Sequence, residues 1–242
     1  MYSIIIPAFN EAECLAATLL SVKEAMARMK GLGEFIVVDN NSTDQTAKIA
    51  ASYGAKVVFE PINQISRARN AGAKVAKGEY FIFLDADTII TAELLRETLQ
   101  VLSANSCCGG GALVEMGESA SVIGKSIFML FVALAQIQNT ATGCFIFCRA
   151  DAYHAVGGFN ERLYATEEYF FSLKLKKWGR KNGMPFKLLR QVKVLTSSRK
   201  FEAPASLVSM LVTILVPFSI FFRSTCGFWY KRDGDVKKKK DG

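Results

Sequence analysis

Histidine and proline are scarce in this chain, and its cysteines are not arranged as metal ligands. The 242 residues include one histidine, five prolines and six cysteines, and no two cysteines form a CxxC pair. A single histidine, His154, cannot complete a Cys/His zinc cluster with such cysteines. We therefore exclude a zinc site of this kind and expect the cysteines to be small buried hydrophobic residues. His154 is expected to be structural or to face solvent.

Two glycine-rich nucleotide-binding motifs are also missing. A dehydrogenase of the Rossmann type needs GxGxxG after its first strand, where this chain has PAFNEAE, and no GxxxxGK[ST] sequence occurs. The three glycines at 109–111 come too late in the chain for either role. These absences argue against a dehydrogenase, a P-loop NTPase and a nucleotidyltransferase with a glycine-rich phosphate loop.

The excess of positive charge is concentrated at the end of the chain. There are 30 basic and 22 acidic residues, for a formal charge of +8. Residues 223–242 contain seven basic and three acidic residues, which is half of that excess. The remainder is only mildly basic, so we expect no nucleic-acid partner. The first residues lack a basic segment and a small-residue cleavage site, and we therefore expect no signal peptide and a reducing, cytosolic compartment.

Strands and helices alternate in the first hundred residues. Half of the residues are hydrophobic, and the apolar runs are short and continuous rather than alternating with polar residues. Such runs between helices are typical of a parallel sheet that is covered on both faces. We predict strands over residues 2–6, 35–38, 56–59 and 80–84, and helices over 11–29, 42–51 and 64–76.

After about residue 105 the pattern becomes less regular. We predict strands over 107–115, 142–149 and 187–195, and helices over 122–137 and 166–178. The predicted organisation is an α/β domain over 1–200, with a nucleotide-binding half (1–104) and a second half (105–200), followed by a hydrophobic appendage (201–242). The apolar helix over 122–137 is expected to lie in the core, with a membrane-facing surface as the alternative.

Polar residues follow three of the predicted strands at the point where each strand ends. They are PAFNE at 7–11, DNNS at 39–42 and DAD at 85–87. Because the carboxyl ends of parallel strands share one edge of a sheet, these residues should line one crevice. Asp85 and Asp87 can point the same way, and such carboxylates suit a hard divalent cation whose other positions are filled by substrate phosphates. A lone DxD can also merely cap a helix, but its place after a buried strand favours the metal role.

Five sequence blocks resemble one enzyme family. The runs IIIPAFNEAE, VVDNNSTDQT and ISRARNAGAKVAKGEYFIFLDADT, followed by VGGFNERL and ATEEYFF, look like a family 2 glycosyltransferase of GT-A fold. The resemblance covers roughly residues 1–200. It implies a Rossmann-like nucleotide-binding half, an acceptor-side half and a mostly parallel central sheet. It also implies a nucleotide-diphosphate sugar as donor, a hydroxyl acceptor, and Mg²⁺ or Mn²⁺.

The resemblance implies a role for each matching residue. The donor-binding residues would be Pro7, Ala8 and Glu11 at the base and ribose, Asp39 at the base, Arg67 at the pyrophosphate or base, and Asp85 with Ala86 at the ribose. Asp87, with Asp85, would ligate the metal. Glu168 would be the general base, with Glu167 beside it. The alternatives are a solvated helix face for Arg67 and Arg69, and stabilisation of a helix N-terminus for the two glutamates.

One expected metal ligand is missing. The family often has a histidine near the end of the sheet, where this chain has Thr196-Ser197-Ser198-Arg199. The metal would then rest on Asp87, phosphates and water. The implied reaction is a metal-assisted inverting displacement, in which a carboxylate takes the proton of the attacking hydroxyl. The alternative function is a catalytically degenerate GT-A-like scaffold or binding protein at a membrane.

The segment 203–222 has twenty residues without a charge, which is the length of a transmembrane helix. Basic residues flank it on both sides, so a single span would conflict with the positive-inside tendency. We expect it to dip into the membrane or lie in its interface, with spanning or burial as alternatives. Lys237–Lys240 would suit an anionic leaflet, or form a solvated end. We therefore expect a peripheral or monotopic enzyme on the cytosolic face, acting on a lipid-linked or membrane-proximal acceptor.

Overall fold

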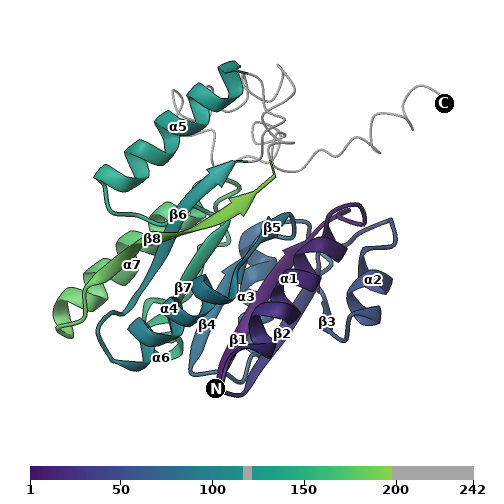
Figure 1. Cartoon of the computed structure of the whole chain (residues 1–242), viewed down its shortest axis with the longest axis horizontal. Helices are drawn as coiled ribbons and strands as arrows, with labels where there is room; N and C mark the ends of the chain where they lie inside the picture. The colour runs from purple at the N-terminus through teal and green to yellow at the C-terminus, as the bar shows by residue number, and fades with distance from the viewer. Residues whose placement is uncertain (117–121, 198–242) are drawn as a thin grey trace.

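A single mixed sheet of eight strands runs through the molecule, with helices on both faces (Figure 1). The computed structural model describes residues 1–116 and 122–197, and the strand order is β3-β2-β1-β4-β7-β6-β8-β5. The strands are β1 (Tyr2–Ala8), β2 (Gly33–Asp39), β3 (Lys56–Phe59), β4 (Tyr80–Leu84), β5 (Thr88–Ile89), β6 (Gly109–Met116), β7 (Phe145–Arg149) and β8 (Phe186–Thr196). The helices are α1 (Leu15–Ala27), α2 (Thr46–Ser52), α3 (Ile65–Val75), α4 (Ala92–Ser103), α5 (Val122–Ile137), α6 (Ala150–Val156) and α7 (Glu167–Lys181).

The first four strands in chain order form the parallel part of the sheet. β1 pairs in parallel with β2 and β4, and β2 pairs in parallel with β3. Every residue of β1 is buried, as expected for a strand that is covered on both faces. The prediction of a parallel sheet in this half is confirmed, and the carboxyl ends of these strands lie at one edge.

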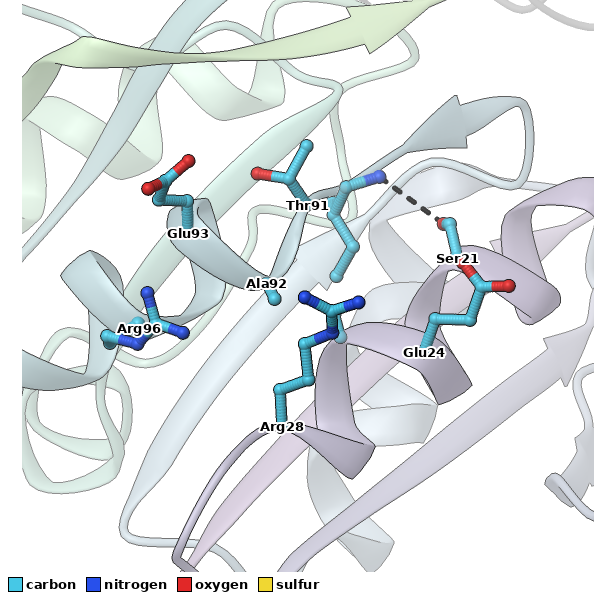
Figure 2. Close-up of a pocket in the computed structure, with 9 residues that line it drawn as sticks. Ser21, Glu24, Arg28, Thr91, Ala92, Glu93 and Arg96 are labelled. Atoms are coloured by element: carbon cyan, nitrogen blue, oxygen red, sulfur yellow. Dashed lines mark hydrogen bonds between the residues drawn. The ribbon is translucent and has the colours of Figure 1, made fainter.

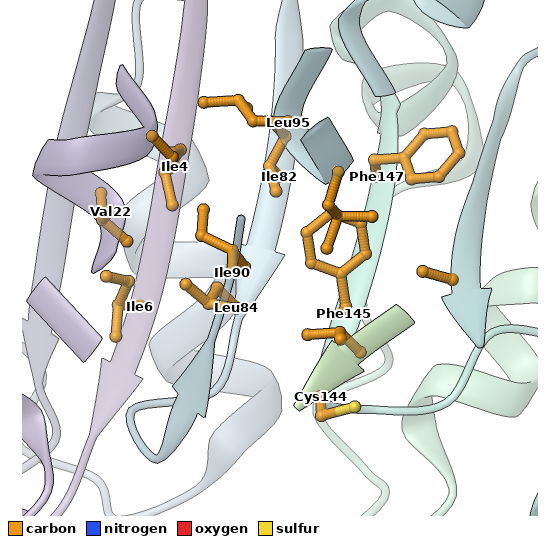
Figure 3. Packing of buried hydrophobic residues seen from close by; sticks show 14 of the residues in the cluster. Ile4, Ile6, Val22, Ile82, Leu84, Ile90, Leu95, Cys144, Phe145 and Phe147 are labelled. Carbon is orange, nitrogen blue, oxygen red and sulfur yellow. The ribbon is translucent and has the colours of Figure 1, made fainter. Parts of the chain in front are cut away.

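Alternate residues of the strands belong to two hydrophobic clusters, one on each face of the sheet. Ile4 and Ile6 belong to a cluster with residues of α1 and α4, while Ile5 belongs to a cluster with residues of α3, α6 and α7. Figure 3 shows the first cluster, in which Ile82 of β4 and Phe147 of β7 pack side by side. The two-residue period of a strand therefore builds a core on both faces from one apolar run.

The second half of the chain joins the sheet mostly by antiparallel pairing. β7 lies between β4 and β6 and is antiparallel to both, whereas β6 and β8 are parallel. Two elements before residue 105, β5 and α4, were not predicted. Thr91 is the N-cap of α4, and its hydroxyl accepts a hydrogen bond from the backbone N–H of Leu94 at 3.1 Å.

The three consecutive glycines have a packing role in β6. A Cβ atom on Gly110 would overlap the carbonyl oxygen of Lys187 in β8, and one on Gly109 would lie 2.6 Å from the carbonyl oxygen of Phe147 in β7. Glycine therefore lets β6 approach both neighbours closely. This agrees with the expectation that these glycines form no nucleotide-binding loop.

α5 is not in the core, so the expectation of burial for 122–137 is wrong. Met129, Leu130 and Ile137 are 69%, 62% and 80% exposed. Within residues 1–116 and 122–197, no helix combines the length and the apolar character needed to cross a bilayer. The segment 203–222 and the Lys237–Lys240 run lie outside the described residues.

Candidate functional site

The loops that follow β1 and β2 are linked by hydrogen bonds. The backbone N–H of Asn10 donates to the Ser42 hydroxyl at 3.1 Å, and the Asn10 side-chain oxygen accepts from the backbone N–H of Thr43 at 2.8 Å. Asn10 and Asn41 have positive φ angles of 50° and 65°, a conformation that asparagine tolerates better than most residues. The predicted meeting of these two strand ends is confirmed.

The residues predicted to line the base and ribose pocket lie together at this corner. Pro7 and Ala8 end β1 beside Val38 and Asp39 of β2. Asp39 is buried, and its carboxylate accepts from the backbone N–H of Ser42 at 3.0 Å. Glu11 is also buried, and its backbone N–H donates to the Thr46 hydroxyl at 2.9 Å. Their contacts with a nucleotide stay predictions.

The DAD loop between β4 and β5 is held from three sides. The backbone N–H of Asp85 donates to the carbonyl of Cys144 at 3.1 Å, and the Thr18 hydroxyl of α1 donates to the carbonyl of Ala86 at 2.8 Å. The backbone N–H of Ser197 donates to the carbonyl of Asp87 at 3.2 Å. The end of β8, where the family's histidine was expected, therefore lies beside Asp87, which is itself buried.

Arg69 of α3 joins this loop to the acidic pair of the second half. Its Nη1 donates to Oε1 of Glu167 at 2.7 Å, and its Nη2 donates to Oδ1 of Asp85 at 3.1 Å and to the carbonyl of Gly143 at 2.8 Å. The guanidinium lies over the ring of Phe159, 5.1 Å from its centroid. Arg69 is only 1% exposed, so it is a buried cation between two carboxylates.

The chemistry of the site explains why an arginine occupies this position. A planar guanidinium can donate to several acceptors at once, whereas a lysine ammonium cannot match this geometry. Burial alone would lower the pKa of Arg69, but the charges of Glu167, Asp85 and Glu168 outweigh it and raise that pKa. Arg69 therefore stays charged in the interior.

Glu168 has a different environment from Glu167. Burial raises the pKa of Glu168 to about 8, the charge of Glu167 adds to this, and Arg69 opposes it. Arg69 makes its ion pair with Glu167 and not with Glu168. A carboxyl with such a pKa is partly ionised near neutral pH, and its ionised form is basic enough to accept a proton as a general base.

The start of α7 is conformationally strained. Thr166, which precedes the two glutamates, has a left-handed φ of 60°, an uncommon value for a β-branched residue. Its carbonyl accepts from the backbone N–H groups of Tyr169 and Phe170. Strain of this kind is often found where side chains must be presented to a site. Both glutamates lie in the first turn of α7, where they also favour the helix dipole, so the two interpretations coexist.

Arg67 lies away from the carboxylate cluster. Its Nη1 forms an ion pair with Glu161 at 3.1 Å, and its Nε donates to Gln64 at 3.1 Å. Asn70 contacts the same segment, since its Nδ2 donates to the carbonyl of Phe159 at 3.0 Å. These contacts dock the GGFNERL segment on α3. The role of Arg67 at the pyrophosphate stays a prediction, and the central role of Arg69 was missed.

A cavity of about 360 Å³ lies elsewhere, between α1 and the start of α4 (Figure 2). Charged side chains of both signs line it, including Glu24, Arg28, Glu93 and Arg96. None of the residues predicted for the functional site lines this cavity. His154, which was expected to be structural or to face solvent, is exposed on α6. The candidate site is therefore the carboxylate cluster around Arg69.

The raised pKa of Glu168 predicts how stability depends on pH. The folded pKa of about 8 exceeds the ordinary value of 4.5, so the folded state retains a proton that the unfolded state releases. The contribution is complete below about pH 4.5 and is lost as pH rises to 8. Urea unfolding at several pH values should show this fall in the free energy of unfolding, and Glu168→Gln should reduce it. Equal slopes in both proteins would contradict the assignment.

Comparison with known proteins identifies the family of the chain. The family model described as "Glycosyl transferase family 2" matches residues 3–156. An uncharacterized glycosyltransferase of Rickettsia conorii is 30% identical in an alignment 190 residues long, which covers 72% of this chain and 31% of that protein. An uncharacterized glycosyltransferase of Haemophilus influenzae is 28% identical in an alignment 184 residues long. This alignment covers 72% of this chain and 62% of the Haemophilus protein.

Solved structures share the fold. The S. aureus protein TarS, solved with UDP-GlcNAc, has a TM-score of 0.63 at 22% identity, over 81% of this chain and 58% of its own. The mannosyltransferase PcManGT of Pyrobaculum calidifontis, solved with GDP-Man and Mn²⁺, has a TM-score of 0.64 at 16% identity, over 80% of this chain and 56% of its own. The chain spans about a third of the length of the Rickettsia relative. The chain belongs to glycosyl transferase family 2 and has the GT-A fold.

Proposed function

We propose that this enzyme moves a sugar from a nucleotide-diphosphate sugar to a hydroxyl acceptor, with inversion at the anomeric carbon and with the help of Mg²⁺ or Mn²⁺. The observation that carries the proposal is the buried Arg69, which brings Asp85 of the donor half and Glu167 of the acceptor half into one cluster. The titles of the TarS and PcManGT structures, which name UDP-GlcNAc, GDP-Man and Mn²⁺, support a donor of this class.

The donor set near the DAD loop fits a hard divalent cation. Carboxylate oxygens are ligands that Mg²⁺ and Mn²⁺ prefer, and substrate phosphates commonly complete their coordination. Asp85 is already paired with Arg69, which leaves Asp87 as the principal protein ligand. Among the described residues no group of three potential metal-binding side chains occurs, so phosphates and water would fill the other positions. A bound cation would neutralise charge on the departing nucleoside diphosphate.

Glu168 is the proposed base. Its carboxylate would take the proton of the acceptor hydroxyl while that oxygen attacks the anomeric carbon from the face opposite the leaving group. The pKa of about 8 suits this task, because proton transfer is most effective when the pKa of the base lies near the working pH. Arg69 and Glu167 would position the start of α7 without exchanging protons themselves.

We further propose that the acceptor is linked to a lipid or lies close to a membrane, on the cytosolic face. The uncharged stretch 203–222 and the seven basic residues after it support this location.

Removal of the Asp87 carboxylate tests the metal site. Asp87→Ala should nearly abolish both nucleoside diphosphate release and metal-dependent nucleotide binding, because the principal protein ligand is lost. The assay is release of the diphosphate from a panel of nucleotide sugars with Mn²⁺. Glu93→Ala, an exposed carboxylate of α4, is the matched control and should behave as wild type. Activity that a chelator leaves unchanged would remove the metal from the proposal.

Replacement of the base should separate binding from chemistry. Glu168→Gln keeps the size of the side chain but cannot accept the proton, so transfer should fall roughly 10²- to 10⁴-fold while donor binding survives. Transfer kinetics and nucleotide titration measure the two effects. A mild Glu168→Gln together with a crippling Glu167→Gln that still binds donor would mean that Glu167 is the base. If neither change affects transfer, Glu168 is not the base.

A further inference from the structure

α5 carries a continuous apolar surface that no described part of the chain covers. The exposed residues recur at helical spacing and form what we term the α5 stripe: Met129, Leu130, Ala133, Leu134 and Ile137. Met129, Leu130, Leu134 and Ile137 are 69%, 62%, 43% and 80% exposed. No charged residue occurs from 126 to 137. Apolar residues at this spacing normally face a core, and a contiguous exposed patch marks an interaction surface.

The stripe is held in a defined place in the fold. The Lys176 ammonium of α7 donates to the carbonyl of Gln138 at 2.8 Å, and the Asn139 side chain donates to the carbonyl of Phe186 at 3.3 Å. These contacts fix the C-terminal end of α5 to α7 and β8. In Figure 1 α5 lies apart from the layer of strands, on the side of β6 and β8.

α7, which contacts the C-terminal end of α5, is rich in basic residues. From residue 169 to 181 α7 contains five basic residues and no acidic one. Lys176 contacts the end of α5, and Lys177 and Arg180 are the next basic residues along α7. An uncharged partner would gain nothing from this cluster, whereas anionic lipid headgroups attract basic residues that lie near the membrane surface. The charge therefore favours a bilayer as the occupant of the stripe.

α5 follows a strand that ends at the edge of the sheet near the candidate site. Met116 of β6 pairs with Thr196 of β8, so these two strands end beside each other. One leads to α5, and the other leads to the uncharged stretch 203–222. The same end of β8 contacts Asp87 through Ser197.

We propose that the α5 stripe inserts into the interface of an anionic bilayer, with α5 lying in the membrane plane. At about 1.5 Å per residue, its 16 residues measure about 24 Å, less than the roughly 30 Å of the hydrocarbon core. Exposed apolar residues beside basic ones are typical of interfacial helices. The inference rests on the membrane location proposed above, but it does not depend on sugar transfer.

Vesicle binding of the full chain tests the inference. Leu130→Glu and Leu134→Glu should each weaken binding to phosphatidylcholine–phosphatidylserine vesicles at least about tenfold, because each loses a buried apolar side chain and adds a repelled charge. The matched control is Leu20→Glu on α1, which is 51% exposed and should bind as wild type. Lys177→Gln should weaken binding to these vesicles but not to pure phosphatidylcholine, and mainly at low salt.

The results of vesicle binding distinguish this inference from the proposed membrane location and from the proposed sugar transfer. If the α5 variants bind vesicles as wild type does, the inference is wrong while the membrane location stands. If the wild-type chain binds neither kind of vesicle, both are wrong, and diphosphate release still tests sugar transfer independently. If Leu134→Glu instead lowers the melting temperature or dissociates an oligomer, with vesicle binding unchanged, the stripe is covered by protein and the inference is overturned.

Discussion

A charged guanidinium in the interior of this protein needs partners from both halves of the chain. Removing an ion from water costs several kcal/mol, so a buried arginine is tolerated only when acceptors surround it. Arg69 finds Asp85 at the end of β4, Glu167 at the start of α7 and the carbonyl of Gly143 before β7. The two halves of the domain, residues 1–104 and the part after residue 104, therefore meet at the carboxylates on which the proposed chemistry depends.

Arg69 also gives the neighbouring carboxylates different environments, because it forms ion pairs with two of them. Asp85 is paired with Arg69, and Asp87 of the same loop is the residue proposed as the principal metal ligand. Because Glu167 takes the other guanidinium nitrogen, Glu168 is buried beside a negative charge, and its pKa rises to about 8. Four carboxylates in one small region would repel one another in the absence of the arginine. Arg69 and its two ion-pair partners therefore hold the site together, whereas Asp87 and Glu168 are the residues proposed to act in it.

Much of this arrangement could be predicted from residue patterns. Continuous apolar runs identified the parallel strands, and polar residues after those strands identified the edge where the site lies. The two-residue β5 and the antiparallel entry of β7 depend on pairing between distant segments, which no local pattern records. α5 was expected in the core because its composition is apolar, but composition does not say what a helix faces.

Helical spacing could have shown which of Arg67 and Arg69 is buried. Ser66, Gly72 and Ala73 lie three or four residues from Arg69 and are small, so they mark the buried face of α3. Arg67 lies on another face, where it pairs with Glu161. The motif alone could not distinguish the two arginines, whereas the positions of the small residues favour Arg69 as the buried one.

A double-mutant cycle on Arg69 and Glu167 tests the central claim most directly. The free energy of unfolding would be measured for wild type, Arg69→Met, Glu167→Gln and the double variant. Removing the arginine alone leaves carboxylates buried without their cation, so it should be the most harmful change. We predict that the double variant is more stable than Arg69→Met, with a coupling energy of at least about 2 kcal/mol. Additive losses would show that the two halves of the site are not joined through this ion pair.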